Sequence, residues 1–266
     1  MENLIDDSHF RVNVISKTER PNLVSYSAMH QDYSETDCEY NKFSKLSESE
    51  LGDRLIRNCI KKQHWGILEH PSITFNVVGY PHSVMVQART HRVGVSFDCQ
   101  SQRYTGKRIL KLSEELLDLS INVKDWKDDS KELTPCFNLI EPVFYFRPIG
   151  FYKDRQGSSY EYLGKLRNKH LYECWEKING YARDVEKFGF APEHARDLLP
   201  QNIRQNFVVT FNARSLLHFC DMRLPKDAQL EIRDLATRLF AYFKKWMPEV
   251  AENYENTRYG KNKLAP

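Results

Sequence analysis

The stretch QARTHRVGVSFDCQSQRYT, residues 87–105, organises the structure that the sequence predicts. It contains three arginines, one histidine, two serines and three glutamines, and too few apolar residues for a core element. Guanidinium, hydroxyl and amide groups are those that proteins use to bind a phosphate and the edge of a nucleobase. The stretch therefore predicts a nucleotide site.

The elements before this stretch define its position in the fold. Residues 72–78 are predicted to form a strand that ends at Gly79-Tyr80-Pro81, and Pro81 then starts a helix that runs toward His91. The stretch thus spans a helix end and the loop after it, with Arg89 and Arg92 on roughly one helical face. A solvated helix end, whose arginines pair with surface acids, explains the same residues equally well.

The rest of the chain alternates between predicted strands and helices. Residues 10–15 and 207–211 favour strands. Ser47 and Glu50 have the spacing of a capping box, and Asn212 is an expected N-cap. Helices are predicted over residues 21–29, 47–62, 160–187, 191–200, 212–223 and 228–248. Because no interdomain linker stands out, this pattern predicts a single mixed α/β (α+β) domain over residues 1–266, with a central sheet and long helices.

Composition excludes several classes of protein. The 39 basic and 36 acidic side chains give a net charge of only +3, which does not favour a dedicated nucleic-acid-binding protein. The six cysteines form no C-x-x-C pair, which indicates reduced thiols in a cytoplasmic protein rather than a disulfide framework or a zinc ribbon. No signal peptide and no apolar run of about 20 residues is seen, so no membrane association is expected.

A second group of polar residues lies in NARSLLHFCDMR, residues 212–223. Asn212, Arg214, His218 and Arg223 recur at near-helical intervals among apolar neighbours, and partly buried polar groups need partners. An internal ion-pair network would satisfy them as well as a cofactor would, and the sequence slightly favours the network.

A third group is HWGILEH, residues 64–70. Its two histidines and one glutamate suggest a metal, but the spacing is not that of H-E-x-x-H, so no metal is predicted. Stacking of His64 or Trp65 on a planar ligand is favoured over a metal, and a core role for Trp65 is favoured further. Cys99 has no neighbour that marks it as an activated nucleophile, so we expect a packed or ligand-adjacent thiol.

Taken in this order, the three segments resemble the flavin-dependent thymidylate synthases. The signature of that family is Arg-His-Arg, seven residues and then Ser; here it reads Thr90-His91-Arg92, eight residues and Ser101. Residues 212–215, with Arg223 and Ala228-Gln229, match the family's C-terminal block, and residues 64–70 keep both histidines and Glu69 of its "His-Glu-Thr-Pro-Phe-Glu-His" block. The resemblance covers roughly residues 47–105 and 190–245. It leaves a divergent middle insertion at about 106–165 and a C-terminal tail at about 249–266.

This resemblance implies reductive methylation of dUMP to dTMP without an enzyme nucleophile. It implies FAD as cofactor, methylenetetrahydrofolate as carbon donor, NADPH as reductant, and a homotetramer with active sites shared between subunits. Residues that would hold or adjoin FAD are Gly66, Arg89, Thr90, His91, Arg92, Cys99, Asn212, Arg214 and His218. Residues that would bind dUMP are Gln87, Gln100, Ser101, Gln102, Arg103 and Arg196. Arg223 would lie against the uracil ring as the catalytic residue, and His64 would lie near the flavin and folate.

Two departures from the family signature leave other functions open. Thr90 replaces the first signature arginine, and the neighbouring Arg89 is a candidate to supply the missing guanidinium. The alternatives are a non-catalytic nucleotide- or RNA-binding protein and a relative that has lost activity.

Overall fold

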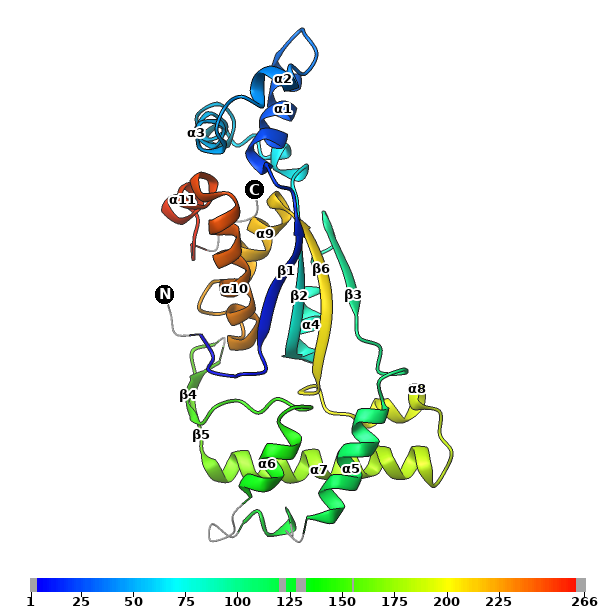
Figure 1. Ribbon diagram of the computed structural model, residues 1–266. Helices are drawn as coiled ribbons and strands as arrows, with labels where there is room; N and C mark the ends of the chain where they lie inside the picture. The colour runs from blue at the N-terminus through cyan, green and yellow to red at the C-terminus, as the bar shows by residue number, and fades with distance from the viewer. Residues whose placement is uncertain (1–3, 120–122, 128–132, 155, 262–266) are drawn as a thin grey trace. The chain divides into compact units, whose positions relative to one another are not determined.

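The computed structural model describes residues 4–119, 123–127, 133–154 and 156–261 (Figure 1). The fold is mixed α/β, which confirms the predicted class of a central sheet with long helices. The central sheet has four strands in the order β1-β2-β6-β3. These strands are β1 (Arg11–Lys17), β2 (Ser72–Pro81), β3 (Val95–Cys99) and β6 (Arg204–Asn212).

The chain divides into two compact units. The first unit contains the described residues of segments 1–77, 87–98 and 207–266, and the second those of segments 78–86 and 99–206. Strands β2 and β6 contribute residues to both units. The single domain, the insertion at 106–165 and the tail at 249–266 stay predictions. Residues 120–122, 128–132 and 155 of that insertion and 262–266 of that tail lie outside the described residues.

The first unit packs its helices around β1, β2 and β6. Its helices are α1 (Pro21–Tyr33), α2 (Tyr40–Phe43), α3 (Glu48–Asn58), α9 (Ala213–Arg223), α10 (Leu230–Trp246) and α11 (Pro248–Thr257), with the short 3₁₀ helices η1 (Ile60–Lys62) and η2 (Gly66–Glu69). Figure 1 shows α9 and α10 beside the sheet. Two hydrogen bonds of 2.8 Å join α10 to β1 and the residue after it, from the Tyr242 hydroxyl to the Val12 carbonyl and from Trp246 Nε1 to the Thr18 carbonyl.

The core of the first unit lies between the sheet and these helices. Alternate residues of β2 point inward, as expected for a strand with a repeat of two, and bury Ile73, Phe75 and Val77. Helices α9 and α10 contact each other and complete this core. Their fully or almost fully buried apolar side chains include Leu216, Leu217, Phe219, Leu235, Leu239 and Phe243.

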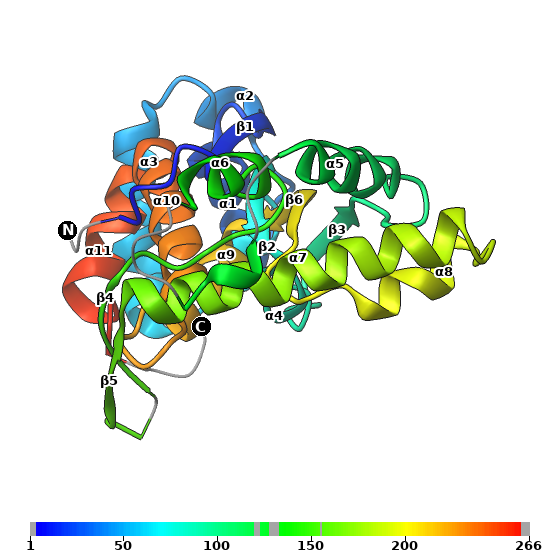
Figure 2. The same cartoon turned by 90° about the horizontal axis from the view of Figure 1, so that it is seen from below.

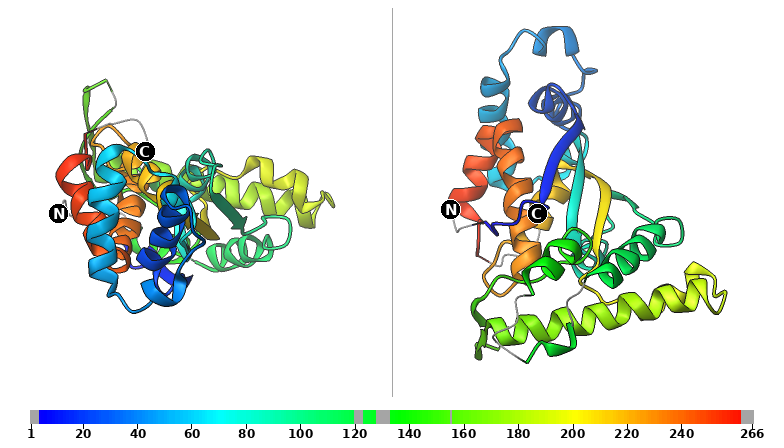
Figure 3. Two further views of the ribbon diagram at one scale, coloured as in Figure 1. Left: turned by 90° about the horizontal axis from the view of Figure 1, so that it is seen from above. Right: turned by 60° about the horizontal axis from the view of Figure 1, so that its bottom comes forward.

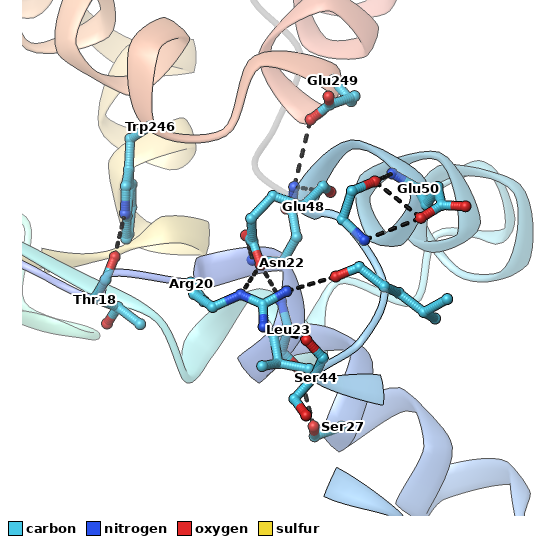
Figure 4. A network of polar contacts seen from close by, with 12 residues as sticks. Thr18, Arg20, Asn22, Leu23, Ser27, Ser44, Glu48, Glu50, Trp246 and Glu249 are labelled. Atoms are coloured by element: carbon cyan, nitrogen blue, oxygen red, sulfur yellow. Dashed lines mark hydrogen bonds and ion pairs between the residues drawn. The ribbon is translucent and has the colours of Figure 1, made fainter. Parts of the chain in front are cut away.

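Polar groups at two helix starts hold the N-terminal helices together (Figure 4). The capping box predicted at the start of α3 is confirmed, because Glu50 N–H donates to Ser47 Oγ and Ser47 N–H donates to Glu50 Oε2. The carboxylate of Glu48 accepts the backbone N–H groups of Asn22 and Leu23 at 2.9 and 3.3 Å. Glu48 therefore caps α1 from another element. Helix α3 also lies next to α11 (Figure 3, light blue and red).

The second unit is mainly helical. Its helices are α5 (Lys107–Asp118), α6 (Thr134–Ile140), α7 (Gly164–Glu186) and α8 (Pro192–Ala195), with the 3₁₀ helices η3 (Val123–Asp125) and η4 (Arg196–Leu198). Helix α5 packs against α6 and α7 (Figure 2). An antiparallel hairpin, β4 (Gly150–Lys153) and β5 (Ser159–Tyr162), precedes α7. The core side chains of this unit include Ile109, Leu112, Leu116, Phe137, Ile140, Phe144, Leu171, Ile178 and Tyr181.

The prediction of a helix end followed by a loop over residues 87–105 is partly wrong. Helix α4 (His82–Ala88) ends before Arg89, so Arg89 and Arg92 do not share a helical face. Residues 95–99 instead form the edge strand β3, in which Val95, Phe97 and Cys99 are partly buried and the residues between them are exposed. The many polar residues of this stretch concealed the alternation that is typical of a strand.

The prediction that Gly79-Tyr80-Pro81 ends the second strand is also wrong, because β2 continues through Pro81. Gly79 has a φ of 82°, which a glycine adopts without strain. Side chains of β6 bond its peptide groups: Gly79 N–H donates to Asn206 Oδ1 at 3.0 Å and its carbonyl accepts Arg204 Nη1 at 2.8 Å. Hydrogen bonds from β6 therefore let β2 continue through Gly79-Tyr80-Pro81, although glycine and proline often end a strand.

The described part of the chain after α10 includes a helix that packs on the rest of the first unit. Helix α10 ends at Trp246, Pro248 begins α11, and Tyr254 of α11 is only 1% exposed. Among the described residues, no helix combines the length and apolar character needed to cross a membrane.

Candidate active site

The predicted site residues fall into two groups, one in each unit. The group in the first unit comprises His64, Gly66, Gln87, Arg89, Thr90, His91, Arg92, Asn212, Arg214, His218 and Arg223. The group in the second unit comprises Cys99, Gln100, Ser101, Gln102, Arg103 and Arg196. The family resemblance assigns both Arg103 and Arg223 to dUMP, but they belong to different units, so their meeting at one site stays a prediction.

The loop between α4 and β3, residues 89–94, carries Thr90-His91-Arg92 of the family signature and is here called the signature loop; it is held against the start of α9. The predicted N-cap is confirmed, since Asn212 Oδ1 accepts the N–H of Ser215 at 2.8 Å. Ser215 Oγ donates to the Val93 carbonyl at 2.6 Å, and Asn212 N–H donates to the Gly94 carbonyl at 3.0 Å. Gly94 has a φ of 65°, and a Cβ there would collide with the Asn212 amide and the Ser215 hydroxyl. Glycine at 94 thus lets two distant segments meet.

The other end of α9 brings Arg223 to the same loop. Arg223 Nε donates to His91 Nε2 at 3.1 Å, and its Nη2 donates to Thr90 Oγ1 at 3.1 Å. The same Nη2 lies 3.4 Å from the Gln87 carbonyl, to which Thr90 Oγ1 also donates at 2.7 Å. Thr90, which stands where the family signature has an arginine, is therefore a direct partner of the predicted catalytic residue.

Burial keeps His91 neutral. Its side chain is 8% exposed, and its ring packs edge-on against Phe219 and His218 at 4.9 and 5.3 Å between centroids. Burial, reinforced by the positive charge of Arg223, lowers the pKa of His91 from 6.5 to about 4. Because Nε2 accepts a hydrogen bond from Arg223, the ring proton of the neutral imidazole lies on Nδ1. Burial also lowers the pKa of Arg223, which remains a cation at neutral pH.

Two features of the first unit fit a bound group. His218 Nδ1 is buried and has no hydrogen-bond partner among the residues that the structure describes, and burial lowers the pKa of this histidine. An unsatisfied buried polar atom costs roughly 1–3 kcal/mol, so a ligand atom or a water is expected there. A Cβ on Gly66 would meet nothing within 4 Å, so this glycine borders open space. These features suit a large planar cofactor.

The 64–70 segment is attached to its surroundings through three side chains. The Tyr33 hydroxyl hydrogen-bonds His64 Nδ1, and their rings stack at 5.8 Å with only 6° between their planes. The Arg258 guanidinium lies over the ring of half-buried Trp65 at 5.7 Å. Arg214 Nη1 pairs with Glu69 Oε1 at 2.6 Å. The described part of the chain holds no cluster of three or more His, Cys, Asp or Glu side chains suited to a metal ion.

In the second unit, two of the predicted dUMP ligands meet at one residue. Arg103 Nη2 lies 3.7 Å from Glu193 Oε1, and Arg196 Nε donates to the Glu193 carbonyl at 3.2 Å. The Arg103 guanidinium also lies over the Tyr104 ring at 5.5 Å. Arg103 and Arg196, which are far apart in sequence, are thus neighbours through α8.

The turn after β3 is held in place by β6. Gln100 N–H donates to the Asn206 carbonyl at 2.8 Å, and Gln100 Oε1 accepts Asn206 N–H at 3.3 Å. The Ser101 carbonyl then accepts the N–H groups of Tyr104 and Thr105, which closes a turn around Gln102. Cys99 ends β3, and none of the six cysteines, all of them described, is in a disulfide.

Sequence reasoning missed several residues that position this site, namely Tyr33, Glu193, Asn206 and Arg258. They lie in segments whose spacing gives no indication of a ligand. Gln229, which the family resemblance included in the Ala228-Gln229 pair, hydrogen-bonds Gln87 and donates to the buried Glu231.

The solved structures that share this fold include a nucleotide methylase and a thymidylate synthase. The UMP/dUMP methylase PolB from Streptomyces cacaoi, bound with 5-Br UMP, matches with a TM-score of 0.66 and 19% identity over 98% of each chain. The flavin-dependent thymidylate synthase ThyX from Helicobacter pylori, complexed with FAD and dUMP, matches with a TM-score of 0.61 and 17% identity over 89% of this chain and 97% of that one. At these identities the likeness establishes the fold.

Sequence comparison identifies the family. The protein-family model described as "Thymidylate synthase complementing protein" matches residues 13–249. The flavin-dependent thymidylate synthase of Haloarcula marismortui is 29% identical over 263 residues, which cover 96% of this chain and 99% of the relative. That of Pyrococcus abyssi is 30% identical over 235 residues, which cover 86% and 77%. The chain therefore belongs to the family of flavin-dependent thymidylate synthases.

Proposed function

We propose that this protein is an enzyme that reductively methylates dUMP to dTMP, with FAD as its redox cofactor. Methylenetetrahydrofolate would donate the carbon and NADPH would be the reductant. The observation that carries the proposal is the half-buried Arg223 guanidinium, which a carbonyl, a hydroxyl and a neutral imidazole orient in a chain of this family. Fixed orientation of a charged donor is a main source of enzymatic rate enhancement.

The residues of the first unit fit FAD. Gly66 would let the cofactor approach the backbone, and the buried Nδ1 of His218 would gain a partner. Arg89 and Arg92 are exposed residues of the signature loop, and their guanidinium groups suit the pyrophosphate of the cofactor. Cys99, which belongs to the second unit, is proposed as a neighbour of the cofactor on the family resemblance alone. When bound, FAD supplies the two-electron reduction that this methylation requires.

The side chain of Arg223 would act on the uracil ring. Its Nε and Nη2 bond to protein acceptors, and among the described residues no group bonds its Nη1. A guanidinium fixed on one edge and open on the other can donate to a carbonyl oxygen of uracil and stabilise negative charge that develops on the ring. Because this charge is stabilised by a cation, the ring needs no covalent attachment to the protein.

Most cysteines of this chain are unsuited to nucleophilic catalysis. Burial raises the pKa of the thiols of Cys59, Cys136, Cys174 and Cys220. The thiolate is the nucleophilic form, so a raised pKa removes it at neutral pH. This supports methylation without an enzyme nucleophile.

The residues of the second unit would bind the phosphate of dUMP. A nucleoside monophosphate carries close to two negative charges at neutral pH, and Arg103 and Arg196 supply two guanidiniums around Glu193. The side chains of Gln100, Ser101 and Gln102 would provide neutral hydrogen bonds. Gln87, which belongs to the first unit, is proposed as a further dUMP ligand on the family resemblance alone. The pair between Arg103 and Glu193 is half-exposed and weak, so a phosphate can displace the carboxylate.

We further propose a homotetramer in the cytoplasm whose active sites are completed by neighbouring subunits. Family membership supports this assembly. Sedimentation of the purified protein, with and without FAD and dUMP, tests it, and a monomer under both conditions would contradict it.

The test of the function is the absorbance spectrum of freshly purified protein, followed by an assay of dTMP formation from dUMP with methylenetetrahydrofolate and NADPH. Oxidised flavin gives bands near about 370 and 450 nm, so these bands together with NADPH-dependent dTMP support the enzyme. A colourless protein that FAD cannot reconstitute, but that binds dUMP or RNA, supports the non-catalytic alternative. A flavoprotein that forms no dTMP is a relative that has lost activity.

A further inference from the structure

Arg258 lies beyond residue 249, where the family-model match ends, and its side chain contacts residues next to the proposed flavin site. Arg258 follows α11, and its Nη2 and Nε donate to Asp221 Oδ2 at 2.7 and 3.3 Å. Asp221 lies on α9, three residues after His218 and two before Arg223. The same guanidinium covers the ring of Trp65, which stands between His64 and Gly66. One side chain thus contacts both segments that are proposed to hold FAD.

This ion pair is buried, unlike most others in the chain. The Asp221 side chain is fully buried and that of Arg258 is 14% exposed. Burial raises the pKa of Asp221, and Arg258 opposes that rise. Removal of one partner of a buried pair leaves an uncompensated charge, which the protein relieves by moving or by taking up a proton. The position of α9 beside Trp65 is therefore sensitive to Arg258.

A second guanidinium joins α9 to the 64–70 segment at the opposite end of α9. Arg214, in the first turn of α9, pairs with Glu69 of η2, and both side chains are substantially exposed. Exposed ion pairs contribute little to stability. A desolvated ion pair whose guanidinium also lies over an indole ring is held in one geometry. Helix α9 and η2 also contact each other directly, and the buried contact of Arg258 adds a second, desolvated connection at Trp65 that the exposed pair of Arg214 does not provide.

We propose that Arg258 is a positioning residue for the flavin site, which bridges Asp221 and Trp65 and so holds the 64–66 segment against α9. This inference rests on the proposed function, because it assigns FAD to that site. A tail residue outside the family-model match would then tune cofactor affinity without touching the cofactor.

The experiment measures FAD affinity, by quenching of flavin fluorescence on titration with apoprotein, in full-length wild type and variants. Arg258→Ala should raise the Kd for FAD by about tenfold, since a loosened segment holds its ligand poorly. Arg258→Lys should raise it by about threefold, because an ammonium restores the charge but not the planar contact with Trp65. The matched control is Lys244→Ala, which breaks the exposed Lys244–Glu255 pair of α10 and α11. It should leave the Kd within about twofold of wild type.

A double-mutant cycle with Trp65 separates positioning from general stability. Trp65→Leu should raise the Kd for FAD in the wild-type background. In the Arg258→Ala background, the same substitution should change the logarithm of Kd by at most half as much. Independent effects of the two substitutions, or an Arg258→Ala protein that melts lower but binds FAD as wild type does, overturn the proposal. If Arg258→Ala does not fold, the same comparison with Arg258→Lys decides.

Failure of the proposed function gives a different result. Wild type that binds no FAD rejects the flavin site itself. The bridge is then tested by the fluorescence emission of Trp65. This emission is the difference between the spectrum of a protein with Trp65 and the spectrum of its Trp65→Phe variant. A spectrum that Arg258→Ala leaves unshifted overturns the bridge, and a red shift supports it.

Discussion

Nε of Arg223 donates a hydrogen bond to Nε2 of His91 across 3.1 Å, and so joins the last turn of α9 to the signature loop. A cation can donate to an imidazole only while that ring nitrogen is unprotonated. The low pKa of His91, about 4, guarantees this state at neutral pH. The orientation of Arg223 therefore depends on a neutral histidine rather than on a carboxylate, which leaves the guanidinium its full charge for a substrate.

We expect Arg223→Ala to lower the turnover of dUMP to dTMP by about two to three orders of magnitude, the scale of a lost electrostatic stabiliser, while the protein keeps its flavin. Arg223→Lys should recover little, because an ammonium cannot bond His91 and Thr90 at once. Steady-state assay at saturating substrates measures this, with the exposed Arg57→Ala of α3 as control. Near-wild-type turnover of Arg223→Ala would remove this residue from the mechanism.

Thr90 gives a sharper test of how Arg223 is oriented. Its hydroxyl accepts Nη2 of Arg223 and donates to the Gln87 carbonyl. Thr90→Val keeps the shape but removes both bonds, so kcat should fall by about tenfold, the scale of one lost hydrogen bond to a charged group. Thr90→Ser keeps the hydroxyl and should stay within about threefold of wild type. Equal activity of the two variants contradicts a role for the hydroxyl.

Thr90 also changes the interpretation of Arg89. The sequence suggested that Arg89 supplies the guanidinium missing at 90, but Arg89 follows the end of α4 and is exposed, whereas the threonine itself bonds Arg223. An arginine at 90 would set two cations side by side, which is unfavourable in a partly buried site. The compensation by Arg89 stays a prediction, and Arg89→Ala tests it through the Kd values for FAD and dUMP.

The low pKa of His91 makes the stability of the protein depend on pH. In the unfolded chain this histidine binds a proton below about pH 6.5, whereas in the folded protein it does so only below about pH 4. The unfolded state thus holds more protons between these values, so the free energy of unfolding falls as pH drops from 6.5 to 4, by about 2–3 kcal/mol in total.

Denaturant titrations of wild type and His91→Asn at several pH values measure this contribution as the difference between the two curves. The curves should converge as pH falls from 6.5 toward 4, since only wild type loses the His91 term. The exposed His70→Asn serves as control and should run parallel to wild type. Parallel curves for His91→Asn would show that His91 does not titrate in this way.

Local sequence signals were sufficient to predict most helices and strands. The exact ends of these elements, and their neighbours in the fold, depend on residues far apart in sequence. The capping box of Ser47 and the N-cap of Asn212 were readable because both bonds close within three residues. Strand β3 was not, since five residues at a sheet edge with polar neighbours carry a weak alternation. The extension of β2 through Gly79 depends on Asn206 and Arg204, more than 120 residues away.

The same distinction holds for the site. The clustered arginines and the three segments could be recognised from composition and order alone. The partners that orient these residues could not be recognised. Arg258 bonds to Asp221 and Tyr33 bonds to His64, and each pair is so far apart in sequence that no local spacing indicates the contact. A sequence lists donors and acceptors, and only packing assigns them to one another.

The phosphate site proposed in the second unit can be tested through Glu193. If Arg103 and Arg196 bind the phosphate of dUMP, Arg103→Ala and Arg196→Ala should each raise the KM for dUMP by about tenfold, with a smaller change in kcat. Arg183→Ala, which removes a guanidinium that is 60% exposed on α7, is the matched control.

Glu193→Gln distinguishes binding from orientation. The Glu193 carboxylate lies 3.7 Å from Arg103 Nη2 and would compete with the phosphate of dUMP for that guanidinium. Removing its charge should therefore leave the KM for dUMP unchanged or lower it by about twofold, and should make binding more sensitive to salt, because the site then carries a larger net positive charge. If Glu193→Gln instead raises the KM as far as Arg103→Ala does, the carboxylate orients the arginine, and the phosphate must be sought at other residues. Because both arginines contact this one glutamate, the three variants assayed together decide whether this part of the second unit is an anion site or an internal ion pair.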